Sequence, residues 1–183
     1  MLITDYLFEN VKPIWDAYLE HDFIMDMGNG NLCKDKFKDY LIQDYLYLKE
    51  YAKVYAMALV KCENIEQMKF CQNSINGILE DESATHIWYL KNFGEKIEEL
   101  EDYKIKEANE NYTSYMKSIA LTGDLLDTMV SVLPCAWSYY YIGKKLKETY
   151  KENLEDNFYK SWIESYSCEG YEQVARTSIE FVN

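Results

Sequence analysis

The sequence contains little glycine and proline, with seven and two residues respectively among 183. A protein made of many short strands uses these residues at its turns, so their scarcity argues against such a fold. No alternation of polar and apolar residues is long enough to require a sheet. Hydrophobic residues make up 48% of the chain, which is sufficient for one core. We therefore expect an all-α protein with a single domain over residues 1–183.

Positive charge is also scarce, because 19 Lys and Arg stand against 32 Asp and Glu and give a net charge of −13. An acidic chain repels a phosphate backbone and an anionic lipid surface, so we expect neither nucleic-acid binding nor membrane binding. No apolar run has the length needed to cross a bilayer. Asp5 and Glu9 lie where a signal peptide would carry basic and apolar residues.

The five cysteines form no C-x-x-C pair and no metal-ligand spacing. An odd, scattered set of this kind indicates thiols in a reducing compartment, so we expect a cytoplasmic protein without a metal or other cofactor. The two histidines, His21 and His86, offer no evident catalytic dyad. We interpret His21 as packing or capping and His86 as structural, although Glu82 precedes His86 by four residues and could bond to it.

Helical periodicity predicts long helices separated by a turn at 26–31 and a charged connector at 95–111. Asn64 followed by Gln67 is typical of a capped helix start, and Asp124 with Asp127 is another such start. Pro134 interrupts a helical pattern and predicts a kink, and Pro13 predicts either a kink or a second helical piece that Asn10 caps and that begins at Val11. The expected helices cover residues 5–21, 35–62, 64–93, 112–123, a central helix opening at 124, 153–166 and 171–182.

One predicted helix carries a polar residue within an aromatic stripe. The stripe has spacings of four, three, four and four residues, and its members are Tyr40, Asp44, Tyr47, Tyr51 and Tyr55. Such a stripe normally faces a core, and we expect Tyr55 to do so. Burying even a neutral polar group without partners costs on the order of 2–7 kcal/mol. Asp44 therefore requires either a structural partner or a ligand that supplies hydrogen-bond donors.

A second helix face carries Cys135, Tyr139, Ile142 and Leu146 at spacings of four, three and four residues. A thiol just after a proline kink, one turn from a phenol, could be a reactive centre. It could equally be a buried structural cysteine, since cysteine is among the most buried residue types.

Four stretches, in this order along the chain, are similar to the signature motifs of the TenA (thiaminase II) family. They are Phe37-x-x-Tyr40-x-x-Gln43-Asp44-x-x-Tyr47-Leu48, Tyr112-Thr113-Ser114-Tyr115-Met116, Leu133-Pro134-Cys135-Ala136-Trp137-Ser138-Tyr139-Tyr140 with Ile142-Gly143, and Trp162-Ile163-x-x-Tyr166. The resemblance covers the chain from Trp15 to about Tyr171. It implies a helical bundle with the architecture of haem oxygenase, assembled as a homo-oligomer, commonly a tetramer.

The resemblance also implies a reaction and residues that perform it. Family members hydrolyse an aminomethyl aminopyrimidine to hydroxymethylpyrimidine and ammonia, or cleave thiamin, as part of thiamin salvage. By resemblance, Asp44 binds the ring nitrogen and exocyclic amine, Tyr112 stacks on or polarises the pyrimidine, and Cys135 adds covalently to the ring. The remaining residues assigned to catalysis or substrate binding by resemblance are Tyr47, Tyr51, Tyr139 and Tyr166.

The chain departs from the family pattern at one point, because it stops at Asn183, before the last helix, which carries the family's catalytic glutamate. Two alternatives to a catalytically active family member stay open, the second because the family shares the architecture of haem oxygenase. One is a pyrimidine-binding or regulatory protein without catalytic turnover. The other is a haem-handling enzyme that uses His21 as an axial ligand, and the scarcity of histidine disfavours it.

Overall fold

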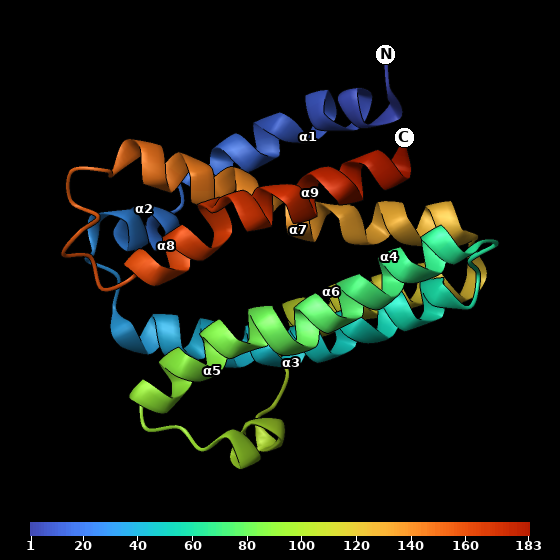
Figure 1. Ribbon diagram of the computed structural model, residues 1–183. Coiled ribbons are helices and arrows are strands. Elements are labelled where there is room, and N and C mark those ends of the chain that lie inside the picture. Colours follow the sequence, from blue (N-terminus) through green and yellow to red (C-terminus); the bar gives the residue numbers. More distant parts are fainter. The chain divides into compact units, whose positions relative to one another are not determined.

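The computed structural model describes residues 1–80 and 84–183, and no strand occurs in these two ranges. Figure 1 shows the helices coloured along the chain, which confirms the all-α class predicted from the sequence. The α-helices are α1 (Ile3–Leu19), α2 (Asp22–Asn29), α3 (Lys34–Leu59), α4 (Ile65–Asn76), α5 (Ser83–Asn92), α6 (Glu107–Thr122), α7 (Leu125–Thr149), α8 (Lys160–Ser167) and α9 (Glu169–Val182). A π-helical segment spans Gly77–Glu82 and a 3-10 helix spans Ile97–Asp102.

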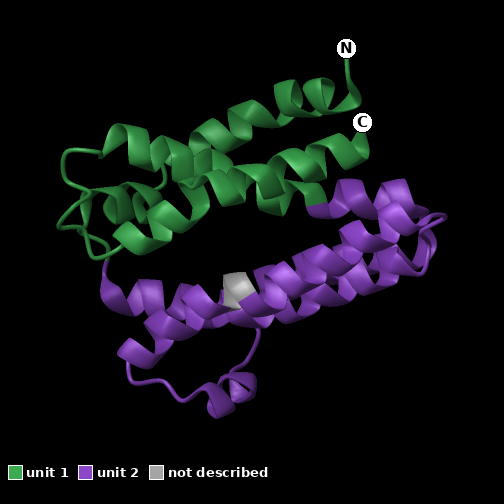
Figure 2. Cartoon of the chain, in the orientation of Figure 1, with its two compact units in different colours: residues 1–32, 133–183 green, residues 33–132 purple. Residues whose placement is uncertain are grey.

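The helices form two compact units, which Figure 2 shows in different colours. Unit 1 contains residues 1–32 and 133–183, and unit 2 contains residues 33–132. Helix α7 contributes its first residues to unit 2 and the rest to unit 1. The expectation of a single domain stays a prediction.

Unit 2 is built around α3, which packs against α4, α5 and α6. Helix α3 is buried along most of its length because its apolar and aromatic residues recur every three or four positions. Tyr55 is 3% exposed and belongs to this core, as expected. Lys61, just after α3, bonds to the end of α6, since its Nζ donates to the carbonyl of the C-cap residue Gly123 at 2.6 Å.

Unit 1 has a core of large aromatic rings contributed by α1 and α7. The ring of Phe8 stacks on Trp137 with centroids 5.3 Å apart, and Trp15 meets the same indole edge-on at 5.5 Å. The segment before α8 is anchored by Asn157, whose Nδ2 donates to the carbonyls of Met27 and Gly28 at 3.0 and 2.9 Å.

The start of the chain differs from the expected single helix followed by a turn. Helix α1 ends at Leu19 and contains Pro13, and a separate helix, α2, covers most of the predicted turn. The reason is local capping, because Nδ1 of His21 accepts a hydrogen bond from the Phe23 amide at 3.1 Å. Helix α2 then ends at Gly30, whose φ of 77° is a conformation that favours glycine. The interpretation of His21 as a capping residue is confirmed.

Other predicted boundaries also shift. Asn64 Oδ1 accepts from the Gln67 amide at 3.0 Å, as expected, but the helix that it opens passes through the π-helical segment before α5. Helix α6 begins at Glu107, so Tyr112 lies in its second turn and not at its start. Helix α8 begins at Lys160 because the long-range bonds of Asn157 hold the preceding residues in turns.

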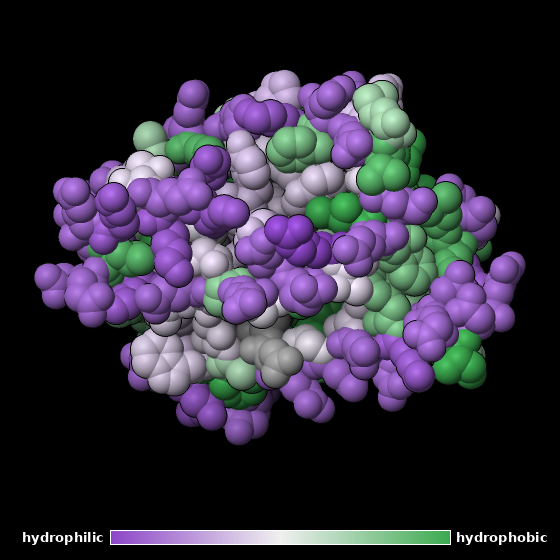
Figure 3. Space-filling view, turned by 45° about the horizontal axis from the view of Figure 1, so that its top comes forward, coloured by the Kyte–Doolittle hydropathy of each residue, from purple (hydrophilic) through white to green (hydrophobic). Residues whose placement is uncertain are grey.

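Hydrophilic side chains predominate on the face shown in Figure 3, with smaller apolar areas between them. In the part of the chain that the structure describes, no helix combines the length and the apolar character needed to cross a membrane.

Candidate active site

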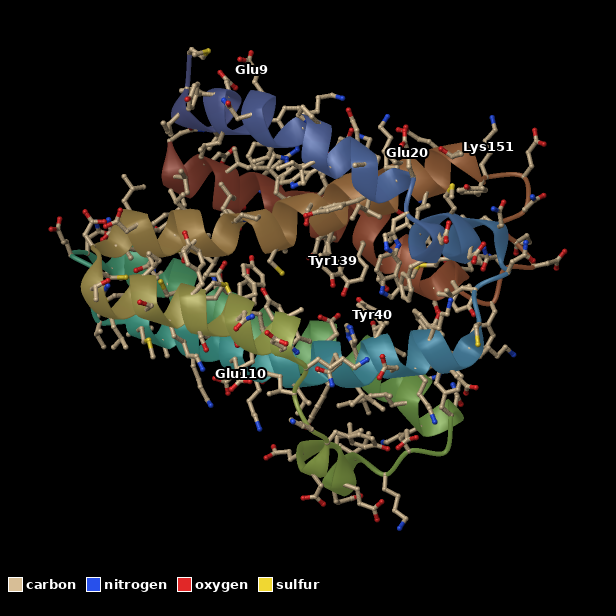
Figure 4. All side chains as sticks on the ribbon, turned by 180° about the vertical axis from the view of Figure 1, so that it is seen from behind. Glu9, Glu20, Tyr40, Glu110, Tyr139 and Lys151 are labelled. Carbon is tan, nitrogen blue, oxygen red and sulfur yellow. The ribbon has the colours of Figure 1, made fainter. Side chains whose placement is uncertain are left out.

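Asp44 lies on the buried face of α3 with 7% of its surface exposed. Its Oδ2 accepts two hydrogen bonds, one from the hydroxyl of Tyr40 at 2.7 Å and one from Nε2 of His86, also at 2.7 Å. Tyr40 lies one turn earlier on the same helix, where Figure 4 labels it, and His86 comes from α5. Asp44 thus has the partners that a buried carboxylate requires.

His86 is completely buried, with no exposed surface. An ionised carboxylate has only acceptors, so Nε2 of His86 must carry the proton in this pair. Hydrogen bonds to an ionised partner are stronger than those between neutral groups, which fixes the Asp44 side chain in one orientation. No hydrogen bond to the other oxygen of Asp44, Oδ1, occurs within the described part of the chain.

The rings of three tyrosines form a stack. Tyr47 and Tyr51 follow Asp44 on α3, and Tyr112 lies on α6. The ring of Tyr47 lies between those of Tyr51 and Tyr112, with centroids 5.2 and 5.8 Å away and interplanar angles of 23° and 9°. Tyr112 is 36% exposed, whereas Tyr47 and Tyr51 are buried. The hydroxyl of Tyr51 donates to the carbonyl of Val132 at 3.0 Å. Tyr112 is thus the partly exposed member of the stack, and an aromatic side chain of this kind can stack on a flat aromatic ligand.

The position of Tyr112 is set by a brace between α3 and the start of α6. Nδ2 of Asn109 donates to the Gln43 carbonyl at 2.7 Å, and Oε1 of Gln43 accepts from the Lys106 amide at 2.8 Å. Nε2 of Gln43 donates to the Lys104 carbonyl at 3.0 Å. Gln43 is the neighbour of Asp44 in the sequence, so this brace anchors α6 beside the carboxylate.

Cys135 lies in unit 1, on α7, and is 7% exposed. Tyr139 follows one turn later and is labelled in Figure 4. Its ring meets that of Tyr166 on α8 at a centroid distance of 4.7 Å and that of Trp162 at 6.0 Å. These contacts place two of the predicted site residues, Tyr139 and Tyr166, side by side.

Gly143 allows α8 to approach α7 closely at this point. A Cβ atom added to Gly143 would lie 2.8 Å from Cβ of Tyr166 and 2.9 Å from its carbonyl carbon. Such distances are shorter than van der Waals contact, so a larger residue at 143 would displace the backbone that carries Tyr166.

The predicted site residues therefore form two groups. Within unit 2, the structure brings Tyr47, Tyr51 and Tyr112 together and places Asp44 one turn before Tyr47. Within unit 1, it brings Tyr139 and Tyr166 together and places Cys135 one turn before Tyr139. That all of these residues act on one substrate stays a prediction.

Comparison with known proteins identifies the family. Residues 8–183 match the TENA/THI-4/PQQC family. The chain belongs to this family. It is 35% identical to the aminopyrimidine aminohydrolase of Helicobacter pylori, over 100% of this chain and 84% of that protein. It is 37% identical to the aminopyrimidine aminohydrolase of Halalkalibacterium halodurans, over 97% of this chain and 79% of that protein.

Solved structures agree with the family. A TenA family transcription regulator from Silicibacter sp. TM1040 superposes with a TM-score of 0.89 at 27% identity, covering 98% of this chain and 78% of that one. A domain with a heme oxygenase-like fold from Shewanella denitrificans OS217 has a TM-score of 0.74 at 18% identity, with coverage of 100% and 78%. The TenA resemblance and the haem-oxygenase-like architecture expected from the sequence are thus confirmed.

Sequence reasoning did not identify the two partners of Asp44 in this TenA family member. Tyr40 was in the aromatic stripe but received no role, and His86 was interpreted as structural. His86 directly precedes an apolar run that includes the buried residues Tyr89 and Leu90, three and four positions later. A histidine on one apolar helix face and a carboxylate on another both need hydrogen-bond partners when buried. That need could have predicted that His86 and Asp44 bond to each other. The alternative partner considered for His86, Glu82, lies outside the described residues.

Within residues 1–80 and 84–183, no three His, Cys, Asp or Glu side chains are close enough together to hold a metal ion. The carboxylate and histidine at the centre of unit 2 instead bond to each other.

Proposed function

We propose that this protein is an aminopyrimidine aminohydrolase of the thiaminase II type. It hydrolyses an aminomethyl aminopyrimidine to hydroxymethylpyrimidine and ammonia in thiamin salvage, and thiamin is a further substrate. The observation that carries the proposal is identity of 35% and 37%, across nearly the whole chain, to two proteins with that activity in their names. The buried acceptor Asp44 and the tyrosine stack are the features that such a substrate requires.

Recognition is the task that we assign to unit 2. An aminopyrimidine is flat and carries an amine that donates hydrogen bonds. Oδ1 of Asp44 accepts from this amine, and a charge-assisted bond of this kind is stronger than a neutral one. The exposed ring of Tyr112, supported by Tyr47, provides a stacking surface for the pyrimidine.

The covalent chemistry is the task that we assign to Cys135. Its thiolate adds to the pyrimidine ring, and the ring nitrogens take up the displaced electron density together with a proton. The adduct expels the amine of the aminomethyl group as ammonia and leaves an exocyclic double bond. Water adds to this bond, and departure of the cysteine restores the aromatic ring and the free thiolate. Tyr139 and Tyr166 line the reacting ring and assist the proton transfers.

The experiment is to incubate the purified full chain with an aminomethyl aminopyrimidine and measure ammonia by a coupled enzymatic assay and the pyrimidine product by chromatography. Stoichiometric ammonia and hydroxymethylpyrimidine are expected. Binding measured by calorimetry without any turnover would favour the alternative of a pyrimidine-binding or regulatory protein. Absence of both binding and turnover would reject the proposal.

We place the enzyme in the cytoplasm, as a homo-oligomer of the tetrameric kind found in its family. All five cysteines lie in the described residues and none forms a disulfide, which agrees with a reducing compartment. Light scattering coupled to gel filtration tests the oligomeric state, with a mass of about four chains expected and a monomer mass contradicting it.

A further inference from the structure

The pattern of hydrogen bonds at Asp44 is asymmetric between its two oxygens. Tyr40 and His86 both donate to Oδ2, each at 2.7 Å, and no described residue donates to Oδ1. A carboxylate oxygen has two lone pairs, so two donors occupy Oδ2 completely. Within the described residues, Oδ1 is therefore the oxygen of Asp44 with capacity to accept further hydrogen bonds.

Burial makes this asymmetry a fixed feature. His86 is 0% exposed and Asp44 only 7% exposed, so water cannot easily replace either partner. Tyr40 and Asp44 are one turn apart on α3, and His86 comes from α5, which packs against α3. The two donors thus approach the carboxylate from two different helices, and rotation of the Asp44 side chain would break both bonds.

We propose that His86 and Tyr40 are positioning residues for recognition of the substrate's exocyclic amine. This inference rests on the proposed function and adds two residues to it. By occupying Oδ2, they hold the Asp44 side chain in one orientation and direct Oδ1 toward the amine. They do not touch the substrate in this proposal and act only through Asp44.

The substitutions that test the idea keep the volume and change only the donor. His86→Gln retains an N–H close to the position of Nε2, whereas His86→Leu removes it. Tyr40→Phe removes the second donor and keeps the ring. Tyr103→Phe is the matched control, because Tyr103 is 42% exposed and its hydroxyl bonds to Glu95.

Calorimetric titration with two ligands separates positioning from general structure. One ligand is a methyl aminopyrimidine, and the other is the same pyrimidine with hydrogen in place of the amine. His86→Leu and Tyr40→Phe should each weaken binding of the amino ligand by about tenfold or more, the loss typical when a partner that orients a binding side chain is removed. Binding of the ligand without an amine should change little, and His86→Gln and Tyr103→Phe should resemble the parent protein.

Each alternative result is decisive. Equal losses for the two ligands, or unchanged binding of the amino ligand in both His86→Leu and Tyr40→Phe, would overturn the positioning role. If His86→Leu does not fold, as judged by circular dichroism, Tyr40→Phe alone carries the test. A parent protein that binds neither ligand would reject the proposed function itself, which distinguishes that failure from failure of this inference.

Discussion

Asp44 in unit 2 is held by hydrogen bonds from two helices, whereas Tyr139 and Tyr166 in unit 1 are held by contacts between rings. Hydrogen bonds fix the orientation of a polar side chain, which suits recognition of a polar group on a ligand. Ring contacts fix the spacing between helices, and Gly143 makes that spacing unusually small. The two surroundings should therefore respond to different substitutions, one to changes of charge and the other to changes of volume.

The largest effect is expected at the nucleophile. Cys135→Ser is nearly isosteric, so the ring-packed surroundings should survive. A serine hydroxyl is far less acidic than a thiol, so kcat for ammonia release should fall by a factor of about 1,000 or more, as expected when a covalent path is lost.

Cys168→Ser is the matched control for this substitution. Cys168 lies in the same unit, is exposed, and caps α9 through Sγ, a position that serine also fills well. Its variant should keep the parent rate. If Cys135→Ser retains the parent rate in steady-state kinetics, covalent catalysis by Cys135 is excluded.

A smaller effect is expected from volume at the contact between α7 and α8. Gly143→Ala forces a methyl group against the backbone of Tyr166, and overpacking of this kind costs about 1–3 kcal/mol. Chemical denaturation should show that loss in the free energy of unfolding.

Gly77→Ala provides the comparison, because no atom of the described residues outside its own stretch of helix lies within 4 Å of the added methyl group. Alanine is favoured over glycine in helices by about 0.5–1 kcal/mol, so Gly77→Ala should be neutral or stabilising. Equal stability of the two variants would mean that the close approach at Gly143 does not constrain unit 1.

The smallest effect concerns charge in unit 2. Burial alone raises the pKa of Glu50, but hydrogen bonds from Lys117 and Lys53, both at 2.6 Å, outweigh it and hold the pKa below its usual range. A carboxylate whose pKa is lower in the folded state stabilises the protein above its unfolded pKa of about 4.3. That stabilisation is lost as the pH falls through the folded value.

Glu50→Gln should thus lower the free energy of unfolding at pH 7 by up to about 1 kcal/mol, since Lys53 is largely exposed and screened by solvent. The difference between variant and parent should shrink when denaturation is repeated near pH 3, where an ordinary glutamate is protonated, and it should vanish once the pH is below the lowered pKa of Glu50. Glu98→Gln, at an exposed position, should show no difference at either pH. A Glu50→Gln difference that persists at low pH would point to packing and not to charge.

The sequence was most informative where the interactions are local. The capped starts at Asn64 and Asp124 are present, because each cap bonds to an amide three residues later. The aromatic stripe also correctly predicted that Asp44 is buried and needs hydrogen-bond partners.

The sequence was least informative where the deciding partner is distant. His86 is 42 residues from Asp44, and no periodicity within one helix indicates that pairing. The predicted helix start at Asn153 was wrong for a similar reason, since Asn157 bonds to carbonyls 129 and 130 residues away. The roles of Cys135, Tyr139 and Tyr166 came from resemblance, because a buried thiol has no physical signature that separates a reactive cysteine from a structural one.

The central claim is that Asp44 recognises an amine on a pyrimidine, and Asp44→Asn tests it most directly. Because Tyr40 and His86 both donate toward Oδ2, the amide of asparagine should turn its oxygen toward them and present its NH₂ group to the ligand.

Two donors would then face each other, and calorimetric titration should show an aminopyrimidine binding more weakly by roughly 1.5–3 kcal/mol. An analogue with an oxo group in place of the amine should bind the variant better than the parent, because its acceptor matches the new donor. Unchanged affinity for the aminopyrimidine, with no gain for the oxo analogue, would show that Asp44 is a structural carboxylate.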